Sequence, residues 1–192
     1  MLRKVLLGGL LSTSLLFGSN AEININDNTL EAGVELSLNE VYELSEDANY
    51  FLTANYLSSE EETEEESSPN LIGVGLKMMS PYIDDYGFKF GLGIKGVVAN
   101  NYTKDFLALP LNIFAVFYLN NKISFDVEAH YAPKVLTYAD GKTYQEGRIK
   151  ANYEVLENGN IFIGTRYIKT IYNDEAKLEY DDSIFFGYKV SF

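Results

Sequence analysis

The sequence predicts an all-β protein, a closed antiparallel up-and-down β-barrel that spans a membrane, and three observations support this prediction. Apolar and polar residues alternate with a period of two through most of the chain after Leu30, which is typical of strands with one apolar and one polar face. Short and long polar connections alternate between these segments, as in transmembrane barrels. The apolar face carries too many large side chains to fit inside a barrel.

A targeting segment precedes the predicted barrel. Arg3 and Lys4 are followed by an apolar run over residues 5–17, and Ser19 and Ala21 place small residues where a signal peptidase recognises them. The run is short for a membrane span. We therefore expect a cleaved signal peptide over residues 1–21 and a single barrel domain over residues 22–192. A buried N-terminal helix or a membrane anchor is the alternative.

Composition excludes several classes of protein. The 192 residues are 46% hydrophobic, contain no Cys and carry a formal net charge of −13. The absence of Cys excludes disulfides and thiolate sites, and the acidic balance argues against a nucleic-acid partner because phosphate binding needs clustered Lys and Arg. A mean hydropathy of −0.10, with one long apolar run, excludes a helical membrane bundle. We expect no cofactor.

The alternating segments give the strand count. Nine segments are predicted from Leu30 onward, and a closed antiparallel barrel of a bacterial outer membrane has an even number of strands. Counting residues 22–26 as a short first strand gives ten, which we favour; rejecting one segment gives eight. The nine segments are 30–38, 48–57, 71–79, 88–98, 107–119, 123–131, 144–155, 161–171 and 184–192.

The connections differ in length at the two ends of the barrel. Short periplasmic turns and longer external loops are typical of outer-membrane barrels. The predicted long connections include an acidic external loop over residues 58–70, which contains six Glu. The short connections are 80–87, 120–122 and 156–160, and the other long ones are 99–106, 133–143 and 172–182.

The two faces of the strands point to opposite environments. The polar face combines charged residues with Gly33, Gly73, Gly75, Gly93 and Gly164 among others, and small and charged residues together fill a narrow interior. The apolar face then meets lipid, as interfacial girdles of aromatic residues would indicate; an ordinary sandwich core is the alternative. The predicted girdle residues are Tyr50, Tyr56, Phe88, Phe117, Tyr131, Tyr153, Tyr167 and Tyr188.

Several stretches resemble the YfaZ family of outer-membrane barrels. The most specific is the Tyr-Gln-Glu strand, followed after a short turn by Gly164, Arg166 and Tyr167. The resemblance implies a barrel fold and an outer-membrane location, and it brings no catalytic residues. Residues 22–70 match poorly. The matching stretches are GVGLK (73–77), FGLGIKGVVANNYT (90–103), EAHYAPKVL (128–136), YQEGRIKANYEV (144–155), NIFIGTRYI (160–168) and FFGYKVSF (185–192).

The last predicted strand carries a candidate signal for barrel assembly, with a chance aromatic terminus as the alternative. Phe186, Tyr188 and the terminal Phe192 alternate along it, which resembles the signal that the barrel assembly machinery recognises. We therefore expect this machinery to be a partner during biogenesis.

Polar side chains on the inward face form the candidate site. Charges of both signs in a narrow interior should pair, since unpaired buried charges are costly, whereas an open selective channel would favour rings of one sign. Glu31 and Glu35 also lie on this face. The candidate lumen cluster is Lys77, Lys89, Lys95, Asp126, Glu128, His130, Glu146, Arg148, Lys150, Glu154, Arg166 and Lys189.

Two further features give weak functional signals. His130 is the single histidine, and Ser124 lies too far along the same strand to form a catalytic dyad with it. The acidic run lacks the glycine and the spaced Asp and Asn of a calcium loop, so a solvated, self-repelling loop is favoured over a cation site. That candidate cation-binding run is Glu60, Glu61, Glu62, Glu64, Glu65 and Glu66.

These observations predict a small barrel in the outer membrane of a Gram-negative bacterium, with a structural or surface-interaction role and a mostly closed, ion-paired lumen. Outer-membrane lipid and lipopolysaccharide are the expected partners. A narrow porin-like channel for small solutes is the alternative, and a barrel enzyme or a soluble periplasmic barrel is less favoured.

Overall fold

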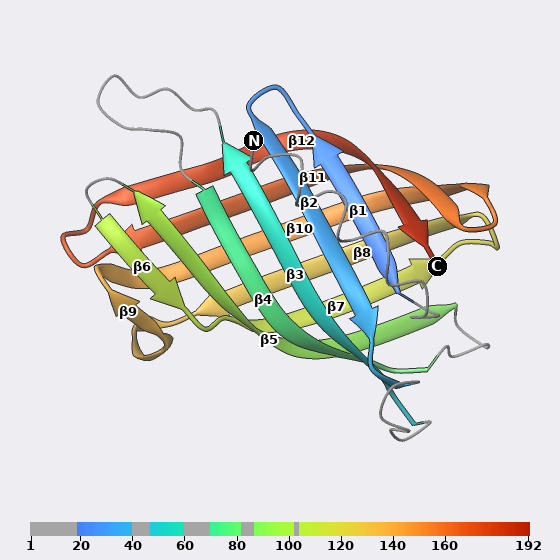
Figure 1. Ribbon diagram of the computed structural model, residues 1–192, viewed down its shortest axis with the longest axis horizontal. Helices are drawn as coiled ribbons and strands as arrows, with labels where there is room; N and C mark the ends of the chain where they lie inside the picture. The colour runs from blue at the N-terminus through green and yellow to red at the C-terminus, as the bar shows by residue number, and fades with distance from the viewer. Residues whose placement is uncertain (1–18, 40–46, 60–69, 82–86, 102–103) are drawn as a thin grey trace, which may run out of the picture.

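The computed structural model describes residues 19–39, 47–59, 70–81, 87–101 and 104–192, which form a closed antiparallel barrel wall of ten strands (Figure 1). Strands that follow one another along the wall pair as neighbours, and β1 pairs with β12 to close the ring. The wall strands are β1 (Asn20–Ile25), β2 (Thr29–Ser37), β3 (Asn49–Ser59), β4 (Asn70–Met79), β5 (Phe88–Asn101), β7 (Leu111–Tyr118), β8 (Ile123–Ala132), β10 (Gly141–Leu156), β11 (Gly159–Tyr172) and β12 (Lys177–Ser191).

The predicted ten-stranded barrel is confirmed, because the short first strand expected near residues 22–26 is β1. It pairs with β2 on one side and with β12 on the other. The backbone pairing already begins at Ser19, which exchanges two hydrogen bonds with Phe192. Most of the expected signal peptide lies outside the described residues, and cleavage after Ala21 stays a prediction.

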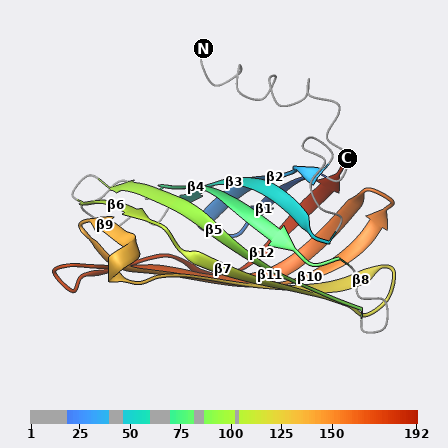
Figure 2. The same ribbon diagram turned by 90° about the horizontal axis from the view of Figure 1, so that it is seen from below.

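Two short strands lie at one end of the barrel, next to the wall. β6 (Lys104–Ala108) pairs with the end of β5, and β9 (Thr137–Ala139) pairs with β6. The predicted segment 107–119 is therefore two strands, separated at Leu109-Pro110. Figure 2 shows a flattened barrel, with β1 to β5 in one layer, β7, β8, β10, β11 and β12 in the other, and β6 and β9 at one end. The 3₁₀ helix η2 (Lys134–Leu136) precedes β9.

The predicted long connections 133–143 and 172–182 are wrong. β11 continues to Tyr172, residues 173–176 make a tight turn, and β12 begins at Lys177. The alternation fails there because the pairing of β11 with β12 shifts register between Ile168 and Lys169, so Tyr180 and Asp181 are both buried. A β-bulge of this kind interrupts the period of two. Likewise, η2, β9 and the start of β10 occupy residues 134–143.

The outward face of the barrel is apolar, as predicted. Ile23, Val74, Leu92, Ile113 and Ile163 are each about half exposed, although they lie in the middle of paired strands. An apolar belt on the outside is the opposite of a water-soluble barrel, and it fits a barrel in the outer membrane, where closure satisfies the backbone groups. The exposed aromatic residues include Tyr56, Phe117, Tyr131, Tyr153 and Tyr188 from the predicted girdles.

Among the residues that the structure describes, no helix is long and apolar enough to cross a membrane.

The lumen as the candidate functional site

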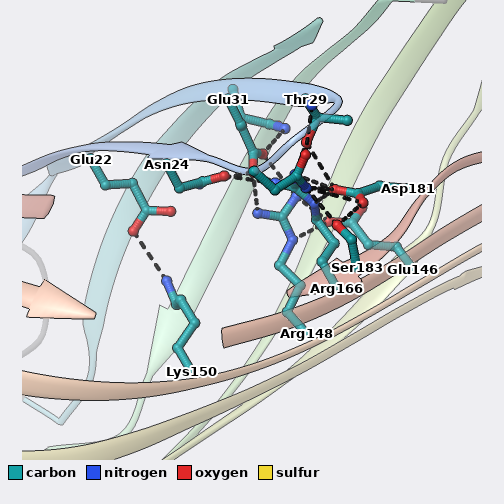
Figure 3. Close-up of polar contacts among 12 residues, drawn as sticks. Glu22, Asn24, Thr29, Glu31, Glu146, Arg148, Lys150, Arg166, Asp181 and Ser183 are labelled. Carbon is teal, nitrogen blue, oxygen red and sulfur yellow. Dashed lines mark hydrogen bonds and ion pairs between the residues drawn. The ribbon is translucent and has the colours of Figure 1, made fainter. Parts of the chain in front are cut away.

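Charged side chains from opposite walls meet in the middle of the lumen (Figure 3). β2 supplies Glu31, while the facing wall supplies Arg148 from β10 and Arg166 from β11. The flattening of the barrel brings the two layers close enough for these side chains to touch. All three residues are buried, so their charged groups are shielded from water and interact with one another.

Arg166 is the most enclosed charge of this layer, with no exposed surface. Its Nε donates to Asp181 at 2.7 Å, and its two terminal nitrogens donate to Asn24 at 2.9 Å and to Thr29 at 2.7 Å. It also forms ion pairs with Glu31 and Asp181. The guanidinium is thus held by β1, β2 and β12, and it ties the short β1–β2 hairpin to the opposite wall.

Arg148 continues the chain of alternating charges. It donates through both terminal nitrogens to the two carboxylate oxygens of Glu31, at 2.7 and 2.8 Å, and through Nε to Glu146 at 2.7 Å. Glu146 also accepts from Lys95 at 2.8 Å and from the Tyr144 hydroxyl at 2.6 Å. Bidentate, charge-assisted bonds of this kind are the strongest that side chains make.

The two arginines face each other directly across the β10–β11 ladder. Like charges in that position destabilise a sheet. The Glu31 carboxylate forms ion pairs with both arginines, and its negative charge offsets the repulsion between them. The network we call the central ionic layer comprises Glu31, Lys95, Glu146, Arg148, Arg166 and Asp181.

Glycine makes room for this layer. A Cβ on Gly164 would lie 2.7 Å from the Phe185 ring, and that ring packs 4.9 Å from the Arg166 guanidinium. Phe185 is fully buried. The bare backbone at Gly164 therefore lets the aromatic ring reach the guanidinium.

Replacing Gly164 with Val should lower the free energy of unfolding by about 1–3 kcal/mol, because overpacking displaces Phe185 from Arg166. Urea titration of the folded barrel in detergent micelles measures the change. Gly147→Val is the matched control, since no atom lies within 4 Å of a Cβ built there. Equal midpoints for the two variants would contradict the proposed close packing.

An apolar cluster fills the lumen beyond the central ionic layer. Phe106 of β6 packs against Tyr144, Tyr172 and Tyr180, with ring centroids 5.8 to 6.4 Å apart. All four rings are almost completely buried. We call this cluster the apolar plug, and it comprises Leu57, Leu71, Val97, Ala99, Phe106, Ala108, Ala132, Tyr144, Ile168, Tyr172 and Tyr180.

The plug lies at the end of the barrel that carries β6, β9 and the 173–176 turn. The turn is tied to β6 there, because Lys104 donates to Asp174 at 2.5 Å. This hydrogen bond lowers the pKa of the exposed Asp174 carboxyl. At the same end, the backbone N–H of Asn173 donates a hydrogen bond to the backbone carbonyl of Asp140.

Below the central ionic layer the lumen stays polar and becomes wider. Lys150 donates to Glu22 at 3.1 Å, and Lys77 donates to Glu35 at 2.8 Å. A cavity of about 90 Å³ lies among these groups. Both ring nitrogens of His130 and the Asn112 Oδ1 are buried in this region without a hydrogen-bond partner in the described part of the chain.

A larger cavity of about 310 Å³ follows, toward the turn at residues 119–122. It is lined by Ser124, Asp126, Asn152, Glu154 and Lys189 among others. We call this space the periplasmic vestibule, after the short connections 120–122 and 156–160 that the sequence predicts on the periplasmic side. The lumen thus has three levels: vestibule, central ionic layer and apolar plug.

The predicted lumen residues distribute over these levels. Lys95, Glu146, Arg148 and Arg166 belong to the central ionic layer. Other predicted residues lie just below this layer, in ion pairs that are separate from its network. Glu154 and Lys189 line the vestibule, and Lys89 packs over the Tyr118 ring at 5.6 Å. The separate pairs involve Lys77 with Glu35, Lys150 with Glu22, Asp126 and Glu128, and His130 with Glu128.

Sequence reasoning missed Glu22, Asn24, Tyr144 and Asp181. Asp181 was assigned to a loop, and the bulge beside it removed the alternation that would have shown it pointing inward. Glu22 and Asn24 alternate with Ile23 and Ile25 along β1. This alternation indicates that Glu22 and Asn24 point inward, but the strand is too short for the pattern to be distinct.

The other predicted sites lie elsewhere. The acidic run at residues 60–66 lies outside the described residues. Phe186, Tyr188 and Phe192 are partly exposed along the last strand. Within the described part of the chain, no group of three or more His, Cys, Asp or Glu side chains is arranged to hold a metal ion.

A family model described as "YfaZ precursor" matches residues 2–192. No curated protein sequence matches the chain. Among solved structures, the chain is similar to OmpT, an outer membrane protein of Vibrio cholerae, with a TM-score of 0.44, 8% identity, and coverage of 96% of this chain and 67% of that one.

Two further structures are similar. The NanC porin gives a TM-score of 0.45 and 10% identity, with coverage of 91% of this chain and 98% of that one. The outer membrane channel DcaP of Acinetobacter baumannii gives a TM-score of 0.46 and 11% identity, with coverage of 89% of this chain and 54% of that one.

Proposed function

The chain belongs to the YfaZ family, and from that premise we propose that this outer-membrane barrel conducts no solutes and acts through its surface, in a structural or interaction role. One observation carries the proposal: two successive barriers fill the lumen. The central ionic layer spans it from β2 to β10 and β11, and the apolar plug fills the external end.

Each barrier opposes conduction for a different physical reason. An ion that crosses the central layer must break pairs among fully desolvated charges, and removing one partner of such a pair costs several kcal/mol. An ion that reaches the plug meets aromatic and aliphatic side chains that offer few polar partners. A hydrated solute would have to move both barriers aside.

The purified full-length protein, inserted into planar lipid bilayers, should give no stable unitary currents. A general porin inserted under the same conditions is the positive control, and far-UV circular dichroism of the same preparation verifies that the strands have formed. Reproducible single-channel steps of one conductance would overturn the proposal.

A narrow channel is the second candidate, and the periplasmic vestibule is the observation that favours it. Its volume of about 310 Å³ is within the range of small-molecule sites. Channel activity would require the central ionic layer to rearrange. Conductance that appears in the wild-type protein only at high voltage would support this second candidate over the first.

The surroundings of His130 do not favour an enzyme. Its ring lies 3.5 Å from the Glu128 carboxylate and packs edge-on against Phe114. A hydrolase of the serine type needs a hydroxyl within hydrogen-bond reach of the histidine, and within the described residues neither ring nitrogen has a hydrogen-bond partner.

The outer surface supports the expected partners. The exposed apolar belt fits outer-membrane lipid, with lipopolysaccharide at the external end. Phe186 of β12 and Phe192, which directly follows that strand, are about half exposed, and the barrel assembly machinery would reach them before β1 pairs with β12. These partnerships remain part of the proposal.

A further inference from the structure

The periplasmic vestibule is lined by three charged side chains, those of Lys122, Glu154 and Lys189, that form no salt bridge within the described part of the chain. Glu154 of β10 and Lys189 of β12 both line it. Within the described part of the chain neither side chain forms a hydrogen bond or a salt bridge, although the Lys189 ammonium lies close enough to Glu35 to act on it electrostatically. This contrasts with the central ionic layer, in which every charged side chain has one at 2.8 Å or less.

The pairing register places these two charges in one row. Glu154 lies opposite Asn160 on β11, and Asn160 lies opposite Lys189 on β12. The two charged residues are therefore two strand spacings apart, about 10 Å between backbones. They flank the amide of Asn160, which also lines the vestibule.

The separation of the charges selects the chemistry of a ligand. A simple anion next to Lys189 would also meet the carboxylates of Asp126, Glu128 and Glu154, and a simple cation next to Glu154 would meet the ammonium groups of Lys77 and Lys189. A molecule with both charges, one at each end, can satisfy both side chains at once. The free ammonium and carboxylate of an amino acid or a short peptide have this arrangement.

We propose that the periplasmic vestibule binds a small zwitterion of the dipeptide class, with its ammonium group on Glu154 and its carboxylate on Lys189. An extended dipeptide spans about 7 Å, which fits between the two side chains. Asn160 offers one donor and one acceptor group to the peptide bond between them. The remaining wall is rich in neutral polar side chains, namely Asn121, Ser124, Asn152 and Ser191.

This binding site is independent of the proposed function, because Glu154 and Lys189 line the vestibule whether or not the lumen conducts. Binding is measured by isothermal titration calorimetry on the full-length protein in detergent micelles. Alanyl-alanine is the probe, and its N-acetylated and C-amidated forms each lack one of the two charges. We expect saturable binding of alanyl-alanine and at least tenfold weaker binding of each capped form, because each has lost one charge-assisted contact.

Substitutions of the two charged side chains test which of them contacts the ligand. Lys189→Gln and Glu154→Gln should each weaken alanyl-alanine binding about tenfold or more. Lys177→Gln, on the exposed external part of the same strand β12, is the matched control and should leave the affinity unchanged. The exchanged pair Glu154→Lys with Lys189→Glu should bind again, with the ligand reversed.

Three results would overturn the proposal. Alanyl-alanine could fail to bind the folded wild-type protein, the capped forms could bind as tightly as the zwitterion, or both Gln variants could bind as tightly as the wild type. A conductance measurement that reveals a channel would contradict the proposed function and leave this binding result unaffected, so the two failures are distinguishable.

Discussion

Replacing Arg166 with Met should lower the free energy of unfolding by about 3–5 kcal/mol, the cost of leaving a buried ionic partner uncompensated. Arg166 has no exposed surface, and it holds both Glu31 and Asp181. Removing the guanidinium also removes the hydrogen bonds that Asn24 and Thr29 accept. The β1–β2 hairpin then loses its main attachment to β11 and β12 across the lumen.

Urea unfolding in phospholipid vesicles measures this loss. The chain has 15 Tyr and no Trp, so far-UV circular dichroism and the gel mobility of unheated samples are the suitable signals. Arg166→Lys should fall between wild type and Arg166→Met, because an ammonium retains the charge and loses the planar fork. A midpoint for Arg166→Met equal to that of wild type would mean that the central ionic layer contributes nothing.

The control for this measurement lies three residues along the same strand. Lys169 donates to Glu179 at 2.7 Å, and the carboxylate is half exposed to solvent. Exposed pairs of this kind contribute little. Lys169→Met should therefore leave the unfolding midpoint unchanged, and a loss as large as that of Arg166→Met would assign the effect to charge in general and not to burial.

Truncating Phe106 to Ala should lower the free energy of unfolding by about 3–5 kcal/mol, as expected for a large aromatic side chain in a packed core. Phe106 is 2% exposed and contacts three tyrosine rings. Its ring packs β6 against the side chains of β10, β11 and β12, so its loss should also loosen β6 and β9. The central ionic layer does not contact Phe106 and should keep its pairs.

The same urea titration tests this prediction, and hydrogen exchange shows where the effect is concentrated. Faster exchange should appear first at β6 and β9. Tyr138→Ala is the control, because Tyr138 lies on β9 beside this region with about half of its surface exposed. If Phe106→Ala and Tyr138→Ala shift the midpoint equally, Phe106 is not part of a packed plug.

The strands of the barrel wall follow closely from the sequence. Alternation along residues 123–131 and 184–192 gave β8 and the lower part of β12, and parity added β1. Alternation is a local property, because neighbouring side chains of a strand point to opposite faces. Alternation therefore identifies both a strand and its lipid-facing side. It succeeded in the parts of the strands that cross the lipid.

The external part of the barrel did not follow from the sequence. Above the apolar belt both faces of a strand meet water or the plug, so the upper halves of β10 and β12 lack a clear alternation. β6 and β9 are short, and only the pairing of β6 with β5 places Phe106 inside the lumen. The sequence offered no local signal for that position.

By itself, the sequence determined that this protein is a transmembrane β-barrel with an apolar outside and a lumen of mixed charge. Only the tertiary structure decided which charges meet. Glu31 reaches Arg148 and Arg166 across 117 and 135 residues of chain, and Glu154 and Lys189 are left apart in one row. The reason is physical: a side chain's face depends on its own strand, whereas its partner depends on the register of every ladder around the closed ring.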